Sequence, residues 1–236
     1  MEFNLQDPTY ENTKPLGESL LNGLSHMSQG GGVYAFATSE GVKAILGDRR
    51  FRDFISKGYY YLVVGTDDIT DIAALNTLKL FEEEYKGHLT VKVYIHSGVG
   101  SILHPKYSWF KGYCSTDLTE EIAGGKIHSE NMAHLSGTSK NTETIKGVLI
   151  IGSGNLTKRG MKNNREAYVV IPCGGRDILE VEDEWQRWIN HSRVCLYDLN
   201  HAVEILAKRD KTILGRIMPA IKKVLMRFGG KAKNER

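Results

Sequence analysis

The alternation of strand-like and helix-like segments between residues 59 and 96 is the feature that most constrains the fold. Residues 59–65 are almost continuously apolar and are followed by Thr-Asp-Asp, as expected of a buried strand. Apolar residues then recur at helical spacing over 69–85, and 90–96 has the pattern of another strand. Such alternation predicts an α/β fold, with a mixed β-sheet flanked by helices on both faces.

The rest of the chain divides into three parts around this pattern. Residues 1–30 are predicted to be a polar lead-in, irregular apart from a short helix within 16–27. Residues 31–198 form the main domain, and residues 199–236 form basic helices and a tail of the kind that links to a further domain. Within the main domain we expect strands over 33–38, 103–110, 148–151, 167–171 and 194–197, and helices over 39–46, 50–56 and 177–189.

Residues 113–146 interrupt the alternation and are predicted to be an insertion near the functional residues. The insertion carries His128, Glu130 and His134. Their spacing fits no common zinc site, so exposed loop histidines are favoured over a metal centre. An arm that touches the substrate is a third interpretation of this stretch.

The chain has 236 residues and a net charge of +3, but the charge is unevenly spread. Residues 200–236 carry ten Lys or Arg and three acidic residues, so the remainder is mildly acidic. This basic end suits either a segment that faces a polyanion or a solvated helix face with a frayed tail.

Cysteine usage and hydropathy point to a reducing compartment. Cys114, Cys173 and Cys195 are widely spaced and form no Cys-x-x-Cys pair. The N-terminal residues lack the pattern of a leader peptide, and no apolar run approaches the length of a membrane span. We therefore expect a cytoplasmic protein that is not bound to a membrane.

Two stretches about forty residues apart carry the chemistry. In the first, His104 and Lys106 should share one face of a strand, because strand side chains alternate. In the second, an apolar strand breaks at a turn that contains Ser153 and Asn155, with Glu166 beyond it. A nucleophile, a cation, an amide and a carboxylate could thus converge on one phosphate.

These residues resemble the phospholipase D superfamily, whose signature is His-x-Lys followed at a distance by Gly-Ser-x-Asn. Many members also carry an Asp five residues after the Lys, but Lys111 stands there in this chain. The Glu eleven residues after the Asn instead makes the chain similar to the phospholipase D-like restriction endonucleases. The resemblance covers residues 30–195.

The resemblance implies an α/β/α sandwich in which residues 31–198 are the catalytic domain. His104 would attack phosphorus and form a phosphohistidine, while Lys106 and Asn155 hold the non-bridging oxygens. Ser153 could add a hydroxyl donor, and Glu166 would orient the His104 ring. No metal or other cofactor is implied. One motif per chain implies a homodimer with a composite site at its interface.

The same resemblance makes DNA the expected substrate. Four basic residues beside the Ser-Gly-Asn turn would suit a nucleic-acid backbone, although a charged, solvated turn is the alternative: Lys158, Arg159, Lys162 and Arg165. In a restriction or defence system, a separate DNA-recognition domain or an ATPase subunit would be a further partner. Two other functions stay open, a lipid phosphodiesterase and a catalytically inactive module that binds DNA or a partner protein.

Overall fold

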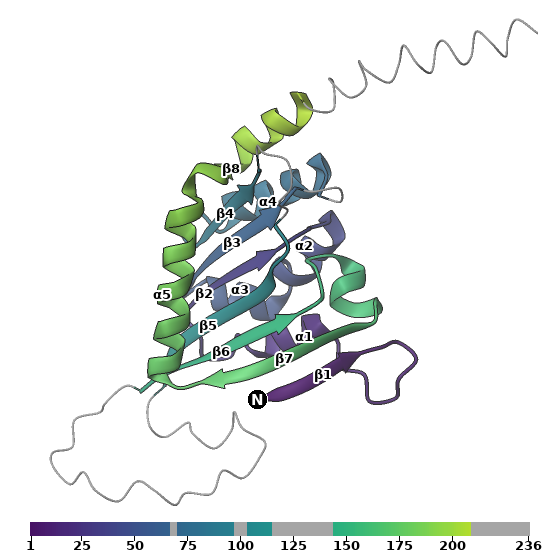
Figure 1. The fold of residues 1–236 in the computed structure, drawn as a ribbon, viewed down its shortest axis with the longest axis vertical. Helices are drawn as coiled ribbons and strands as arrows, with labels where there is room; N and C mark the ends of the chain where they lie inside the picture. The colour runs from purple at the N-terminus through teal and green to yellow at the C-terminus, as the bar shows by residue number, and fades with distance from the viewer. Residues whose placement is uncertain (67–69, 97–102, 115–143, 209–236) are drawn as a thin grey trace, which may run out of the picture.

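The computed structural model describes residues 1–66, 70–96, 103–114 and 144–208 (Figure 1). The histidines of the expected insertion and the helix expected near the C-terminus lie outside these residues. The strands beside the insertion reach further than expected, because β5 runs to Cys114 and β6 starts at Thr144.

The described strands form one eight-stranded sheet. They are β1 (Glu2–Gln6), β2 (Gln29–Tyr34), β3 (Tyr59–Gly65), β4 (Leu89–Tyr94), β5 (Lys106–Cys114), β6 (Thr144–Gly152), β7 (Glu166–Cys173) and β8 (Leu196–Asp198). Their order across the sheet is β1-β7-β6-β5-β2-β3-β4-β8. Strands β2, β3 and β4 run parallel, and the other neighbouring pairs are antiparallel, so the sheet is mixed as predicted.

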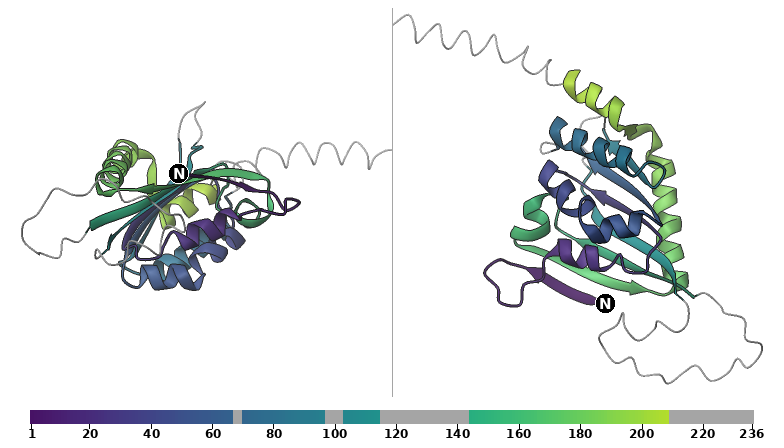
Figure 2. Two further views of the ribbon diagram at one scale, coloured as in Figure 1. Left: turned by 90° about the horizontal axis from the view of Figure 1, so that it is seen from below. Right: turned by 180° about the vertical axis from the view of Figure 1, so that it is seen from behind.

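Helices cover both faces of this sheet, which confirms the predicted α/β layering (Figure 2). One face packs against α1 (Leu16–Asn22), α2 (Ser39–Leu46), α3 (Arg49–Ile55), α4 (Ile72–Glu84) and a helix over 199–208. The other face packs against α5 (Gly175–Ser192), which runs across the strands along the left side of Figure 1. A π-helical turn, η2 (Arg159–Asn163), and a 3-10 turn, η3 (Arg193–Cys195), complete the described elements.

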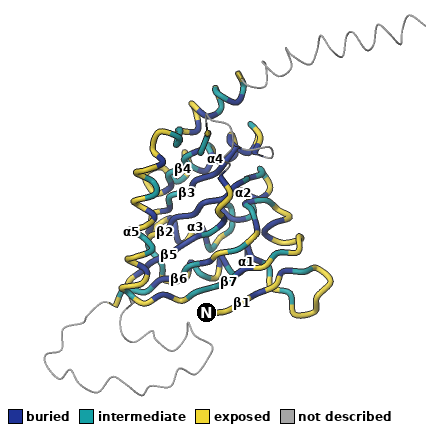
Figure 3. Tube along the Cα trace, viewed as in Figure 1, coloured by how far each residue is buried: buried dark blue, intermediate teal, exposed yellow. Residues whose placement is uncertain are grey.

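Each face has its own apolar core, and buried residues line the sheet between the helix layers (Figure 3). The larger core gathers Leu20, Phe51 and Leu78 from the helices on that side. Trp185 of α5 is the centre of the smaller core and lies against Trp109 at a ring separation of 6.4 Å. Trp185 is thus a core residue rather than a platform for a ligand.

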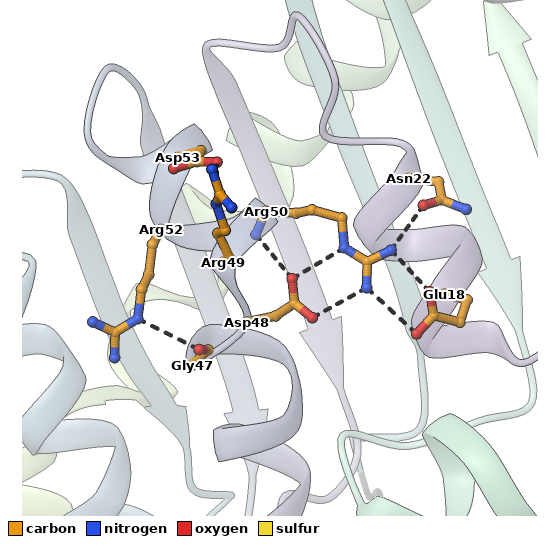
Figure 4. Close-up of polar contacts among 8 residues, drawn as sticks. All are labelled: Glu18, Asn22, Gly47, Asp48, Arg49, Arg50, Arg52 and Asp53. Atoms are coloured by element: carbon orange, nitrogen blue, oxygen red, sulfur yellow. Dashed lines mark hydrogen bonds and ion pairs between the residues drawn. The ribbon is translucent and has the colours of Figure 1, made fainter.

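Side-chain caps start three of the helices. Thr38, Asp48 and Asp71 each accept a hydrogen bond from a backbone N–H in the first turn of the helix that follows. Asp48 also holds Arg50, whose guanidinium reaches Glu18 and Asn22 of α1 (Figure 4). These contacts tie α1 to α3 and keep the guanidinium fully paired.

The N-terminal thirty residues differ from the expected irregular lead-in. Residues 2–6 form β1, which pairs antiparallel with β7 at the edge of the sheet. Asn4 and Gln6 are buried, whereas Phe3 and Leu5 are exposed. The period-2 alternation is therefore present but inverted in polarity, so the segment lacked the usual sign of a half-buried strand.

The three consecutive glycines also lie in a strand rather than in a loop. Gly31 sits in β2 where an added Cβ would come within 2.7 Å of the Trp109 indole nitrogen and 2.9 Å of Trp185. Glycine is required there because bulky aromatic side chains on both neighbouring elements crowd the backbone. No helix among the described residues has the length and apolar character of a membrane span.

Candidate active site

The candidate residues gather at one end of the sheet, on the right-hand side of Figure 1. There β2 and β6 end while β5 and β7 begin. Extending the observed strand registers by two residues for β2–β5 and β6–β7, and by three residues for β5–β6, brings four residues to this end of the sheet: Phe36, His104, Gly154 and Glu166. Sequence segments far apart in the chain therefore meet where the motif residues lie.

His104 and Lys106 are in direct contact. The Lys106 ammonium lies 3.1 Å from Nδ1 and 3.2 Å from Nε2 of the His104 ring, and it donates to the His104 carbonyl at 2.9 Å. The predicted sharing of one face is thus observed, although β5 begins only at Lys106 and His104 precedes it. A neutral imidazole accepts at one ring nitrogen only, so the ammonium can donate to one of the two ring nitrogens at a time.

Lys106 is buried while His104 is exposed. Burial lowers the pKa of the Lys106 ammonium, and the nearby Glu166 carboxylate acts in the opposite direction. Beneath it, the buried Ser108 hydroxyl is bonded to the hydroxyls of Tyr34 at 2.7 Å and Tyr60 at 3.0 Å. Burial raises the pKa of both tyrosines, so this network adds no negative charge near the lysine.

Glu166 opens β7 and is held from two sides. The Ser153 hydroxyl donates to one carboxylate oxygen, and the Asn164 amide donates to the other at 3.2 Å. Ser153 in turn accepts from the Ala167 backbone N–H at 3.1 Å. The structure therefore joins Ser153 and Glu166, whereas a contact between Glu166 and the His104 ring is not recorded among the described residues and stays a prediction.

Asn155 is oriented by the end of β2. Its side-chain oxygen accepts from the Phe36 backbone N–H at 3.1 Å, and a parallel bridge joins Ala37 to Leu156 beside it. A backbone N–H can only donate, so the amide oxygen must face Phe36 and the NH2 group must face elsewhere. No partner for that NH2 group is recorded in the described part of the chain, which leaves it as a donor for an anion.

The four predicted basic residues are all exposed around η2, but they do not form one cluster. Lys158 and Arg159 have no ion pair among the described residues. Lys162 lies near the acidic side chains of Glu18 and Asp48 and contributes to lowering their pKa. Arg165 pairs with Asp7 at 3.0 Å.

Two contributors to the site were not found from the sequence. Phe36 acts through its backbone, for which a sequence carries no signal. Gln6 is buried in β1, where its amide donates to the carbonyls of Gly160 at 3.1 Å and Asn164 at 2.9 Å and its oxygen accepts from the Leu16 N–H at 2.8 Å. Gln6 thereby anchors the π-helical turn. The period-2 alternation of Gln6 with Leu5 was the sequence pattern that could have indicated a strand at this position.

Lys111, at the position where many members of the phospholipase D superfamily carry Asp, lies away from the site. It points to the opposite face from Lys106, because the two residues are five positions apart along β5 and strand side chains alternate. Its ammonium pairs with Glu182 of α5, and both side chains are largely buried. Among the described residues, no cluster of three His, Cys, Asp or Glu side chains could hold a metal ion.

Comparison with known proteins gives remote structural likenesses. No protein-family model and no curated protein match the chain. NucT from Helicobacter pylori matches 84% of this chain and 98% of its own at 13% identity and a TM-score of 0.45. The phospholipase D family member Nuc from Salmonella typhimurium matches 84% and 98% at 12% identity and a TM-score of 0.44.

A polyphosphate kinase from Porphyromonas gingivalis matches 91% of this chain but only 32% of its own, at 11% identity and a TM-score of 0.44. These TM-scores all lie below 0.5. The function proposed for this chain therefore rests on the residues of its own site.

Proposed function

We propose that the chain is a metal-independent phosphodiesterase of the phospholipase D type that cleaves DNA, as the catalytic part of a restriction or defence system. The observation that carries the proposal is the contact between the Lys106 ammonium and the His104 ring, at the end of the sheet where the Glu166 carboxylate also acts on Lys106. A buried lysine held against an exposed imidazole has no evident structural purpose, because burying a cation without a carboxylate in contact is costly.

In the first step, a neutral ring nitrogen of His104 attacks phosphorus. A P–N bond forms as the bond to the leaving oxygen breaks, which gives a phosphohistidine. The incoming phosphate would draw the Lys106 ammonium onto its non-bridging oxygens and release the ring nitrogen for attack. The leaving oxygen takes a proton from a second histidine, which we assign to His104 of the partner subunit in a homodimer.

In the second step, that partner histidine removes a proton from water. The water oxygen attacks phosphorus, the P–N bond breaks and its electron pair returns to the His104 ring. Lys106 and the Asn155 NH2 group stabilise the negative charge on the non-bridging oxygens in both steps. Glu166, fixed by Ser153 and Asn164, places a carboxylate beside Lys106 that helps to keep it cationic.

The exposed basic side chains around η2 support DNA as the substrate. Lys158 and Arg159 follow the Ser-Gly-Asn turn directly, so they lie close enough along the chain to contact phosphates that flank the scissile one. Such contacts act on any sequence, so recognition of a particular site would require a further domain or subunit.

A plasmid-cleavage assay in EDTA tests the proposal. We expect cleavage to survive chelation and to fall by roughly 10³-fold or more in His104→Ala, because the nucleophile is lost. His191→Ala, which removes an exposed histidine on α5, is the matched control and should cleave like the wild type.

Cleavage that returns only when magnesium is added would contradict the mechanism. Release of choline from phosphatidylcholine vesicles, without cleavage of DNA, would instead assign the same chemistry to a lipid.

A further inference from the structure

A hollow lies beside Glu166, and the proposed mechanism assigns no ligand to it. It lies between the end of β1, the loop that follows it and the start of β7, and it is lined by Leu5, Gln6, Asp7, Tyr10, Arg165, Glu166 and Ala167. Glu166 therefore belongs both to the candidate active site and to the wall of this hollow. Gln6, which pairs with Glu166 across the two strands, makes the hollow continuous with the catalytic end of the sheet.

We propose that this hollow binds one unpaired base of the nucleic acid strand that is cleaved. This inference rests on the proposed nuclease function and narrows its substrate to a strand that is single-stranded at that point. Strands in a sheet are about 4.8 Å apart, so β1, three strands away from β5, lies roughly 14 Å from the strand that His104 precedes. The base would therefore belong to a nucleotide a few positions from the scissile phosphate.

The walls offer an apolar and aromatic surface. Tyr10 and Leu5 are 48% and 47% exposed, so both present apolar area that nothing in the described chain covers. Every base has an aromatic face, and an exposed tyrosine ring beside an aliphatic side chain can stack with any of them. The site would thus bind a base without reading its identity.

The loop that carries Tyr10 is held in place by its own hydrogen bonds. Asp7 accepts from the Thr9 backbone N–H at 2.9 Å and from the Thr9 hydroxyl at 2.8 Å, while the Asp7 N–H donates to Thr13 at 2.8 Å. The Tyr10 N–H donates to the Asp7 carbonyl at 2.9 Å, and the Lys14 N–H closes the loop onto Leu5 at 3.1 Å. The backbone that carries the Tyr10 ring is therefore ordered before any ligand arrives, which lowers the entropic cost of binding.

Arg165 supplies the charge that a nucleotide needs. Its Nε lies 3.0 Å from the Asp7 carboxylate, and its side chain is 75% exposed. Asp7 thus orients the guanidinium through Nε, and no partner is recorded for the terminal amino groups among the described residues. Those groups can donate to the phosphate of the nucleotide whose base enters the hollow.

The rim of the hollow favours a base over an acyl chain. Asp7, Arg165 and Glu166 place three charged groups around the apolar walls. A lipid tail requires a continuous apolar surface, and covering these charged groups with it would remove their water without offering them a new hydrogen-bond partner. A base, in contrast, brings polar edges that can meet the rim while its faces contact Tyr10.

A binding experiment separates contact with a base from contact with the backbone. The affinities of a fluorescent oligothymidylate and of an abasic oligonucleotide of the same length are measured by anisotropy, in a His104→Ala background that prevents cleavage. Tyr10→Ala should weaken binding of the oligothymidylate by roughly five- to 150-fold and leave the abasic strand almost unaffected. Tyr10→Phe, which keeps the ring, should bind like the parent.

Tyr59→Ala is the matched control, because Tyr59 is a surface tyrosine at the start of β3, at the other end of the sheet. Equal affinities for the two strands in the parent, or an equal loss for both strands in Tyr10→Ala, would overturn the inference. Stronger binding to phosphatidylcholine vesicles that depends on Tyr10 would also overturn it.

The nuclease proposal itself is tested separately with bis(4-nitrophenyl) phosphate and the cleavage-competent protein. Hydrolysis that depends on His104, together with binding that is insensitive to Tyr10, would remove the base site and leave the nuclease proposal standing. Binding that depends on Tyr10 without any hydrolysis would remove the nuclease proposal instead.

Discussion

Lys106 is the residue whose surroundings bear most directly on the chemistry of the site. Lys106 as a whole is 9% exposed, yet the contacts of its ammonium are the ring nitrogens and carbonyl of His104, with Glu166 acting on it from a greater distance. Burial without a carboxylate in contact favours the neutral amine, which lowers the pKa of Lys106 below its usual value of 10.5. An anionic substrate would reverse part of this cost, so the site is arranged to gain from binding a phosphate.

The lowered pKa of Lys106 predicts how activity depends on pH. If the ammonium stabilises the transition state, kcat/KM falls as Lys106 loses its proton, and this fall lies below pH 10.5 in the wild type. Lys106→Arg keeps its charge because a guanidinium does not deprotonate in this range. We expect the variant to be roughly tenfold slower because the guanidinium differs in shape, but to lose the alkaline decline.

The measurement is the pH profile of bis(4-nitrophenyl) phosphate hydrolysis for both proteins. An identical alkaline decline in the two would show that another group is responsible and that Lys106 is not the titrating cation.

At the same scale, the sequence predicted some contacts and missed others. The contact between His104 and Lys106 was expected from strand alternation, because the two residues are two positions apart. The bond from the Phe36 N–H to Asn155 joins residues 119 positions apart and involves a backbone group. The sequence carries no sign of such a contact, since it exists only once the segments that follow β2 and β6 lie side by side.

Among the elements, β3 and β1 show the limits of periodicity. The strand predicted over 59–65 has those bounds in the structure, because its run of Tyr, Leu and Val is both apolar and β-prone. β1 was missed, since its buried positions hold Asn4 and Gln6 and its exposed positions hold Phe3 and Leu5. Gln6 is buried because its amide donates to the carbonyls of Gly160 in η2 and of Asn164 just after it. A local sequence pattern cannot reveal these contacts.

The bounds of β2 were predicted wrongly for a different reason. The strand was expected over 33–38 after an irregular lead-in, whereas β2 spans Gln29–Tyr34 and contains three glycines. The packing of Trp109, Trp185 and Tyr60 around these glycines leaves no room for side chains. Glycine in a strand indicates such close packing. The residues that pack against it come from β3, β5 and α5, so the glycines alone did not reveal the strand.

The ion pair between β5 and α5 yields a prediction about stability. Lys111 and Glu182 are largely buried, with side chains 10% and 20% exposed. Lys111→Met would leave the Glu182 carboxylate without a partner and should lower the free energy of unfolding by about 2–4 kcal/mol. Replacing both, as Lys111→Met with Glu182→Leu, should recover most of this loss, because no unpaired charge remains buried.

Urea denaturation measures both effects, and hydrolysis by the folded fraction supplies the control. The rate per folded molecule should be unchanged in Lys111→Met, because Lys111 faces away from the site. A folded variant without activity would show instead that Lys111 acts in catalysis.

At the scale of the whole molecule, the mixed sheet brings the site together. β2 and β6 end where β5 and β7 begin, so residues from four separate parts of the sequence meet at one end of the sheet. The alternation of strands and helices predicted this layering, including helices on both faces. The order of the strands could not be predicted, because it depends on pairings between segments as distant as β1 and β7.

A single chain supplies one histidine of the proposed pair. The two-step mechanism needs a base and acid opposite the nucleophile, which is why the proposal includes a homodimer. His104 is exposed where β5 begins, at one end of the sheet, which is compatible with a second copy reaching the same phosphate.

Identification of the covalent intermediate tests the central claim most directly. The protein is mixed with an oligonucleotide, quenched within one turnover under conditions that preserve phosphoramidates, digested and analysed by mass spectrometry. We predict that the peptide containing His104 gains the mass of a phosphoryl-linked nucleotide fragment and that His104→Asn abolishes this adduct together with cleavage. An adduct on another residue, or cleavage by His104→Asn at the wild-type rate, would contradict the account.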